Sequence, residues 1–170
     1  MKEVPITCYY DANWINPVPE RLKSVSGGVV LLGNFPIQWW SQRQSTVADS
    51  VYKAEFSAAK TALENVKNIR VDLMMLGVSV TRPSAFIGDN QSVVLSSSDK
   101  NVNLSKKHVA IAYHNVRAAV HNKVIDPWWI PGRDNPADMF TKPLSPIDLK
   151  RHKKVLFNSH LAERYIALKQ

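Results

Sequence analysis

Four acidic side chains are the residues of this chain whose positions could support chemistry. They are Asp11, Glu55, Asp89 and Asp138. Each lies where the sequence predicts the end of a strand or the start of a helix, in a chain that is otherwise basic, with 22 Lys and Arg against 14 Asp and Glu. Acids gathered at one point of a basic protein favour a divalent-cation site, because hard cations bind oxygen ligands. Taken singly, each acid is more simply explained as a solvated charge or a helix cap.

The composition indicates one intracellular globular domain. Its 170 residues suffice for one domain with a core, and an apolar content of 45% excludes general disorder. No apolar run reaches the roughly 18 residues of a membrane span, and the first residues lack the apolar core of a signal peptide. Cys8 is the sole cysteine, which excludes an internal disulfide and favours a reducing compartment. The net charge of +8 fits a nucleic-acid partner and a plain solvated surface about equally.

Three strands are expected in the first quarter of the chain. Residues 4–10 are rich in β-forming side chains and lead into Asp11, which should end the first strand. Residues 29–32 and 37–41 are two further strand-like runs, and the Gly-Asn-Phe-Pro segment at 33–36 is typical of a hairpin connection. The three runs predict an antiparallel meander.

Helices and strands alternate in the rest of the chain. Apolar residues at steps of three and four predict a long helix that begins after Ser50, its N-cap, and ends near Gly77. Its buried stripe should include Val51 and Leu76, and Glu55 lies at the border of the stripe. The other expected elements are a buried strand at 84–87 that ends at Asp89, a short helix at 90–97, a polar loop at 99–105, a helix at 106–122, a strand at 124–130, a short helix that opens at Asn135-Pro136, and a last helix from Ser145 to about Phe157.

This order predicts an α/β fold with one five-stranded mixed sheet, an antiparallel three-strand meander plus two parallel strands, flanked by helices. A helical crossover returns the chain in the same direction, so the strand at 84–87 should lie parallel to the first. Asp11 and Asp89 would then lie on neighbouring strand ends, at the edge where open α/β sheets carry their sites. Residues 1–157 should form this domain, and residues 158–170 a tail or helix extension.

Seven short motifs follow one another along the chain: DANW at 11–14, KSVSG at 23–27, WSQRQSTVA at 40–48, AEF at 54–56, DNQS at 89–92, SKKH at 105–108 continuing to Tyr113-His114, and ADMFTKPL at 137–144. In this order and spacing they resemble the RNase H domain at the end of the Pol polyprotein of copia-type (Pseudoviridae) LTR retrotransposons. The resemblance covers about residues 8–157. Each motif alone is weakly specific, whereas the ordered set is strongly specific.

The resemblance implies an RNase H-like fold and metal-dependent endonucleolytic cleavage of the RNA strand of RNA–DNA hybrids during reverse transcription. It implies two Mg²⁺ ions, for which Mn²⁺ can substitute, and an adjacent reverse transcriptase domain of the same polyprotein. It implies no membrane partner and a cytoplasmic virus-like particle, with the nucleus as an alternative location. The catalytic and metal-binding residues that it carries over are Asp11, Glu55, Asp89 and Asp138.

Two divalent cations about 4 Å apart would activate a water and stabilise both the phosphate and the leaving oxygen. Asp11 is expected to bridge both cations, because it ends a central strand. Asp89 and Asp138 should hold one cation, and Glu55 should hold the other and help to position the scissile phosphate. Without cations the acids repel one another, so one or more should titrate above the usual value as a coupled set.

The hybrid should be contacted through its backbone and shape rather than through its base sequence. The candidates are polar or cationic residues near the acids: Asn13, Ser24, Ser26, Gln44, Gln91, Lys106, Lys107 and Arg133. For each, a role in a turn, a cap or a solvated surface fits equally well.

The sequence departs from the family pattern at three places. Asp49 and Ser50 precede Val51-Tyr52-Lys53, where the family usually has small and acidic residues. Tyr10 stands where a small Ser or Thr is common, and the loop at 131–136 has no histidine, although many cellular RNases H carry one before the last Asp. The cations, rather than a side-chain base, are therefore expected to carry most of the chemistry.

Aromatic and basic clusters leave further possibilities open. Trp39-Trp40 and Trp128-Trp129 are adjacent pairs on expected strands, so one member of each pair should face the core. The other could stack on nucleic acid or contact another domain. The basic run at 151–154 could bind phosphate, although a solvated helix face explains it more simply.

Two other functions stay open on the sequence alone. A catalytically silent RNase H-like module, a domesticated or scaffold copy, would bind nucleic acid or protein, but the complete set of acids argues against it. An integrase has the same fold with acids in the order Asp, Asp, Glu. Here Glu55 comes second, which disfavours an integrase.

Overall fold

The structure is a computed structural model that describes residues 4–14, 23–45, 47–98 and 107–157, with the backbone alone at 107–110. The expected tail at 158–170, the loop at 99–105 and the candidate contact Lys106 lie outside the described residues. None of the helices in the described ranges is long and apolar enough to span a bilayer.

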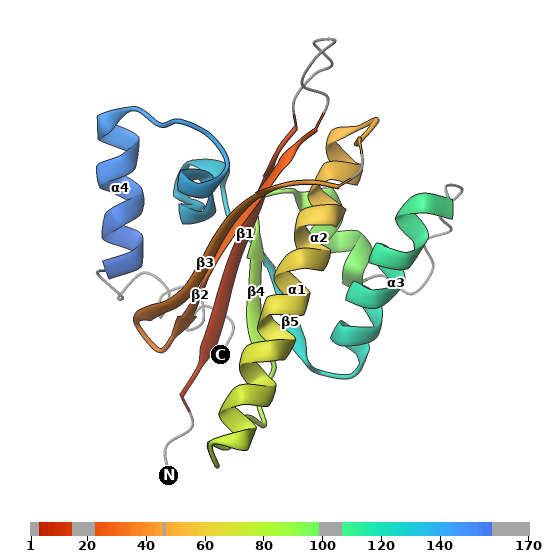
Figure 1. The fold of residues 1–170 in the computed structure, drawn as a ribbon, viewed down its shortest axis with the longest axis vertical. Coiled ribbons are helices and arrows are strands. Elements are labelled where there is room, and N and C mark those ends of the chain that lie inside the picture. Colours follow the sequence, from red (N-terminus) through yellow and green to blue (C-terminus); the bar gives the residue numbers. More distant parts are fainter. Residues whose placement is uncertain (1–3, 15–22, 46, 99–106, 158–170) are drawn as a thin grey trace.

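Five strands form one mixed sheet in the order β3-β2-β1-β4-β5, seen in Figure 1. β1 pairs antiparallel with β2, β2 pairs antiparallel with β3, and β4 is parallel to both β1 and β5, which confirms the predicted topology. The strands are β1 (Ile6–Asn13), β2 (Val25–Leu32), β3 (Phe35–Arg43), β4 (Ser84–Gly88) and β5 (Ile125–Trp129). The helices are α1 (Val51–Met75), α2 (Gln91–Ser98), α3 (Lys107–His121), α4 (Pro146–Phe157) and the 3₁₀ turns η1 (Gly132–Asp134) and η2 (Pro136–Phe140).

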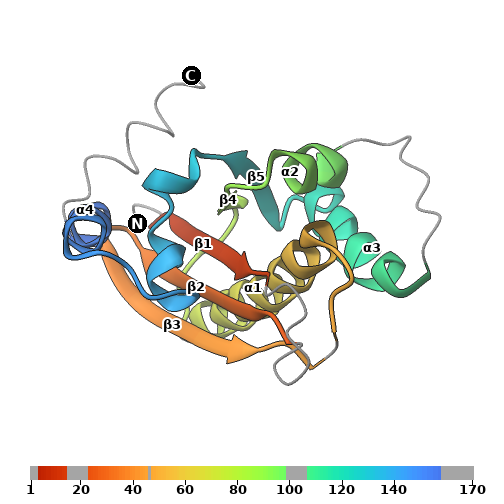
Figure 2. The same ribbon diagram turned by 90° about the horizontal axis from the view of Figure 1, so that it is seen from above.

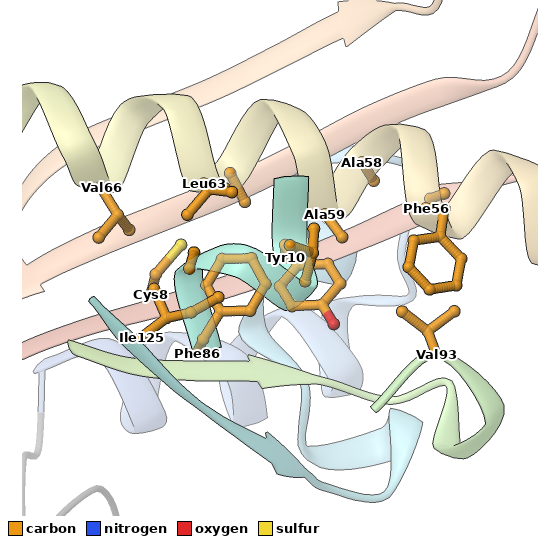
Figure 3. Packing of buried hydrophobic residues seen from close by; sticks show 14 of the residues in the cluster. Cys8, Tyr10, Phe56, Ala58, Ala59, Leu63, Val66, Phe86, Val93 and Ile125 are labelled. Atoms are coloured by element: carbon orange, nitrogen blue, oxygen red, sulfur yellow. The ribbon is translucent and has the colours of Figure 1, made fainter. Parts of the chain in front are cut away.

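Helices cover both faces of the sheet (Figure 2). One core cluster joins Cys8 and Tyr10 of β1 to α1, α2 and α3, and a second joins Tyr9 to η2 and α4. Neighbouring β1 residues therefore serve opposite faces, as the alternation of a strand requires. Figure 3 shows the first cluster around Tyr10 and Phe86, whose ring centroids are 4.5 Å apart.

Tyr10 fits beside the first Asp because the neighbouring strand has no side chain at the facing position. A Cβ atom at Gly88 of β4 would lie 2.6 Å from the Tyr10 ring. The large residue where small ones are common is thus accommodated by a glycine 78 positions later in the chain.

The first strands are longer than the sequence predicted. β1 continues to Asn13, so Asp11 lies within the strand and not at its end, and β2 begins at Val25 rather than at residue 29. The predicted strand began only after Gly27 and Gly28, because glycine is uncommon inside strands, whereas both glycines lie in the ladder, opposite Asp11 and Tyr10. A Cβ atom at Gly28 would lie 2.3 Å from the Trp40 ring, so glycine is required there by a close approach. β3 likewise begins at Phe35, which leaves a two-residue turn at 33–34.

α1 begins and ends where predicted, although its terminal residues are not buried. The Ser50 side chain accepts a hydrogen bond from the Lys53 backbone N–H at 3.4 Å, and Gly77 follows the helix with a φ of +77°. Val51 and Leu76, expected on the buried stripe, are 45% and 78% exposed. A helix of 25 residues is about 37 Å long and extends beyond the sheet that it covers.

One tryptophan of each pair packs on the core, as predicted. Trp40 and Trp128 contact the first and second cluster, respectively, whereas Trp39 is largely exposed and Trp129 is half-exposed. The basic run at 151–154 is not entirely solvated, because His152, a residue of α4, has a buried side chain. The burial lowers the pKa of His152, and its Nδ1 atom has no hydrogen-bond partner among the described residues.

Candidate active site

Three of the four predicted acids meet beside the carboxyl end of β4. Asp11 lies in β1, Asp89 directly follows β4, and Asp138 lies in η2. Each offers a carboxylate oxygen, and these oxygens all lie within 4.8 Å of one another. Asp11 and Asp138 are buried and Asp89 is half-buried. Carboxylates held this closely repel one another unless protons or cations lie between them.

Glu55 borders this group from α1. Its side chain is 5% exposed, and its Oε2 atom has no hydrogen-bond partner among the described residues. Burial, followed by the negative charges of Asp11 and Asp89, raises the pKa of Glu55 to about 9. A buried carboxylate oxygen without a donor is unfavourable, and a cation would satisfy it. The residues therefore fit divalent cations with a preference for oxygen ligands.

Asp11 is held in place through Thr141, the residue that follows η2. The Thr141 hydroxyl donates a hydrogen bond to Asp11 Oδ2, across 130 positions of sequence. The Asn13 side-chain amide in turn donates to the Thr141 carbonyl at 3.3 Å. Burial raises the pKa of Asp11, and the Thr141 hydrogen bond opposes this rise.

A close approach brings η2 to this position. A Cβ atom at Gly27 of β2 would lie 2.7 Å from the Phe140 Cβ and Thr141 Cγ2 atoms. Only a glycine therefore lets the end of η2 rest on the strand beside Asp11. The register of β2 places Gly27 directly opposite Asp11.

Asn135 is a buried residue of the site to which the sequence assigned only the opening of a helix. Its side-chain N–H donates to the Tyr10 carbonyl at 3.0 Å, and its Oδ1 accepts from the Ala137 backbone N–H at 3.1 Å. It is fully buried, and its hydrogen bond lowers the pKa of Asp89. Asn135 thus links the peptide before Asp11, the carboxylate of Asp89 and the turn that carries Asp138.

Asp89 lies between the ends of β4 and β5. The Trp129 indole N–H donates to the Asp89 carbonyl at 2.8 Å, and a Cβ atom at Gly132 would lie 3.0 Å from Asp89 Oδ2. Burial, followed by the charge of Asp11, raises the pKa of Asp89 to about 6.

Lys142 is a second site residue that the sequence did not single out. Its Nζ lies 2.9 Å from Asp138 Oδ1. Burial lowers the pKa of Lys142, but the hydrogen bond to Asp138 and the charges of the surrounding acids outweigh this effect. The pKa of Lys142 therefore lies above its usual value. Burial raises the pKa of Asp138, and Lys142 opposes this rise.

The candidate hybrid contacts divide into buried and surface residues. Ser24, Ser26 and Gln44 are buried. The Gln44 amide donates to Ser26 Oγ at 2.9 Å and to the Ala54 carbonyl at 2.8 Å, which secures the start of α1 beside Glu55. The side chains of these three residues therefore lie inside the protein and not on its surface. Asn13 is half-buried, Gln91 and Arg133 are exposed, and the Lys107 side chain is not described.

Without cations, the stability of the protein should decrease as pH rises. The pKa values of Glu55 and Asp89 lie above their ordinary values, so the folded state holds protons more tightly than the unfolded chain. Their contribution is complete below the unfolded values and is lost as pH rises through about 6 for Asp89 and about 9 for Glu55. In EDTA, the melting temperature should therefore fall by several degrees between about pH 5.5 and about pH 8.5.

Millimolar Mg²⁺ should raise the melting temperature, and most strongly at the alkaline end, where the acids are charged. Glu55→Gln should flatten the pH profile in EDTA. A wild-type melting temperature that is independent of pH and of Mg²⁺ would contradict both the proton linkage and the cation site.

Several solved structures of ribonucleases H share this fold. The N-terminal RNase H domain of a Mycobacterium tuberculosis protein is 16% identical, with a TM-score of 0.59 over 90% of this chain and 99% of that chain. The foamy viral protease-reverse transcriptase in complex with RNA/DNA hybrid is 17% identical, with a TM-score of 0.61 over 82% of this chain and 20% of that chain. LC11-RNase H1 in complex with RNA/DNA hybrid is 15% identical, with a TM-score of 0.57 over 80% and 93%. The sheet order, the helices and these likenesses define an RNase H-like fold.

Sequence comparison identifies more specific relatives than the shared fold does. The Pol polyprotein of transposon RE1 from Arabidopsis thaliana is 31% identical over 137 residues, and that of transposon TNT 1-94 from Nicotiana tabacum is 29% identical over 134 residues. These matches cover 81% and 79% of this chain. The chain is a homologue of one segment of the Pol polyproteins of copia-type retrotransposons. It spans only about a tenth of their length, and no family model matches it.

Proposed function

We propose that this chain is a metal-dependent ribonuclease H that cleaves the RNA strand of RNA–DNA hybrids during reverse transcription. The observation that carries the proposal is the group of Asp11, Asp89 and Asp138, whose oxygens lie within 4.8 Å of one another inside an RNase H-like fold. The homology to Pol polyproteins supports the same reaction and an adjacent reverse transcriptase domain.

The position of each acid determines which cation it would hold. Two divalent cations, Mg²⁺ or Mn²⁺, would supply an activated water and charge stabilisation at the phosphate. Asp11, which lies opposite Gly27 in the β1–β2 ladder and accepts a hydrogen bond from Thr141, would be the acid best suited to hold both cations. Asp89 and Asp138 would hold one cation, and Glu55 the other.

Surface residues around the acids would position the hybrid. Asn13 lies two residues after Asp11, Gln91 opens α2 two residues after Asp89, and Arg133 is exposed in η1. Trp129 presents a half-exposed ring whose N–H is fixed to the Asp89 carbonyl. These residues can contact backbone and sugar without reading base sequence.

A labelled RNA–DNA hybrid tests the proposal directly. The wild-type chain should cut the RNA strand with Mg²⁺ or Mn²⁺ and lose this activity in EDTA. Duplex DNA and single-stranded RNA of the same sequence should stay intact, because the proposed substrate is defined by the paired RNA strand. An inert chain that still binds the hybrid would replace the nuclease by a binding module, and cleavage of duplex DNA would indicate a different nuclease.

A further inference from the structure

Lys142 is held over the acid cluster by the turn that carries Asp138. The Lys142 backbone N–H donates to the Asp138 carbonyl at 3.2 Å, and Thr141 donates to the same carbonyl at 3.2 Å. The backbone of Lys142 is therefore fixed, whereas its side chain is 41% exposed. A four-carbon stem of this kind can place its ammonium group in more than one position.

The ammonium group acts on the whole cluster. It pairs with Asp138 Oδ1 at 2.9 Å, and its charge lowers the pKa of Asp11, Glu55, Asp89 and Asp138. In the metal-free protein, Lys142 thus supplies positive charge where a divalent cation would supply it.

The ion pair with Asp138 and the coordination of a cation by Asp138 are in competition. A cation on Asp138 would lie within a few ångströms of the ammonium group, and like charges at that range repel strongly in a partly buried site. The Lys142 side chain is 41% exposed, so water can solvate its ammonium group when a cation replaces it beside the buried Asp138 carboxylate. When a hybrid is bound, its phosphate backbone is the anion with which the displaced ammonium group can pair.

On the basis of the proposed function, we propose that Lys142 is a displaceable counter-cation. Its ammonium group occupies the Asp138 side of the metal site in the metal-free protein and gives way to the incoming cation. The displaced ammonium group then pairs with a phosphate of the hybrid. Lys142 is a positioning residue in this scheme: it protects the empty cluster and afterwards anchors the substrate.

Calorimetric titration with Mn²⁺ alone tests the displacement without reference to cleavage. Lys142→Met should bind Mn²⁺ about tenfold more tightly than the wild type, because no ammonium group must leave, and it should melt at a lower temperature in EDTA. Lys142→Arg should bind Mn²⁺ more weakly, because a guanidinium pairs with a carboxylate through two hydrogen bonds. Lys60→Met is the matched control: the Lys60 side chain is 43% exposed and pairs with Glu64 at 3.6 Å, away from the cluster.

Salt dependence tests the second position of the ammonium group. If Lys142 reaches a phosphate, Lys142→Met should reduce the slope of log kcat/KM against log salt concentration by about one, because one phosphate contact is lost. Lys60→Met should leave the slope unchanged. An unchanged slope in Lys142→Met overturns the phosphate contact.

Equal or weaker Mn²⁺ binding by Lys142→Met overturns the displacement. If Lys142→Met fails to fold, Lys142→Arg provides the test. Equal or tighter Mn²⁺ binding by Lys142→Arg, compared with the wild type, overturns the displacement. Mn²⁺ binding by the wild type, with no difference in Lys142→Met, refutes this inference and leaves the proposed function standing. If neither protein binds Mn²⁺ and the hybrid stays intact, the metal site of the proposed function fails as well.

Discussion

Asp11→Asn should reduce cleavage of the hybrid by at least about a thousandfold, or about 4 kcal/mol of transition-state stabilisation. Asp11 is 3% exposed and lies within 4.8 Å of oxygens from Asp89 and Asp138. Asparagine has nearly the same shape and can still accept the Thr141 hydrogen bond, so the fold should be retained. The loss would therefore reflect the missing charge and not a missing structure.

The same substitution should stabilise the metal-free protein. Removing one charge from a self-repelling cluster should raise the melting temperature in EDTA by about 2–4 °C, which corresponds to about 1 kcal/mol for a chain of this size. Single-turnover cleavage and thermal melting measure the two effects. Asp72→Asn, on the exposed surface of α1, is the control and should change neither. Cleavage by Asp11→Asn within tenfold of the wild type would remove Asp11 from the catalytic set.

Asn135→Ala should lower the free energy of unfolding by about 3 kcal/mol and impair cleavage as well. The change removes the donor to the Tyr10 carbonyl and the acceptor of the Ala137 backbone N–H, in a side chain that is fully buried. Both backbone groups would be left without their partner, and the turn that carries Asp138 would lose its N-cap. Urea denaturation measures the loss of stability.

A second variant and a control separate the contributions of Asn135. Asn135→Asp keeps the acceptor for Ala137 but loses the donor to Tyr10 and adds a charge beside Asp89, so it should be at least as damaging in EDTA. Asn65→Ala removes an amide that also makes two side-chain hydrogen bonds, with Gln38 and the Thr61 carbonyl, but on the half-buried surface of α1. It should cost about 1 kcal/mol and leave cleavage unchanged. Equal effects of Asn135→Ala and Asn65→Ala would refute a special role for Asn135.

The topology could be predicted because it depends on local patterns. Runs of β-forming residues, the helical spacing of α1 and the direction of a helical crossover were enough to place Asp11 and Asp89 on neighbouring parallel strands. The strand bounds at Gly27 and Gly28 could not be predicted in this way. Glycine marks turns in a sequence, but here it marks where η2 and Trp40 approach the sheet.

The partners of the acids depend on contacts between distant residues. Nothing in the sequence around Lys142 says that its ammonium group meets Asp138, and Asn-Pro at 135–136 indicates a helix start but not a bond to Tyr10. Ser24, Ser26 and Gln44 were predicted as contacts because they are polar residues near the acids. The burial of Ser26 and Gln44 accompanies the hydrogen bonds that join β2 to the start of α1.

The hydrogen bond between Thr141 and Asp11 also determines when the site can form. The two residues are 130 positions apart, whereas β1 and β2 pair across a far shorter stretch of chain. Contacts between residues far apart in the sequence form late, because a long loop must close before they can form. A nascent chain that ends before η2 can pack β1 against β2, α1 and β4, but it lacks Asp138, Thr141 and Lys142. The cluster of acids is therefore completed only after nearly the whole domain has been synthesised, and a growing polypeptide that lacks η2 lacks one of its acids.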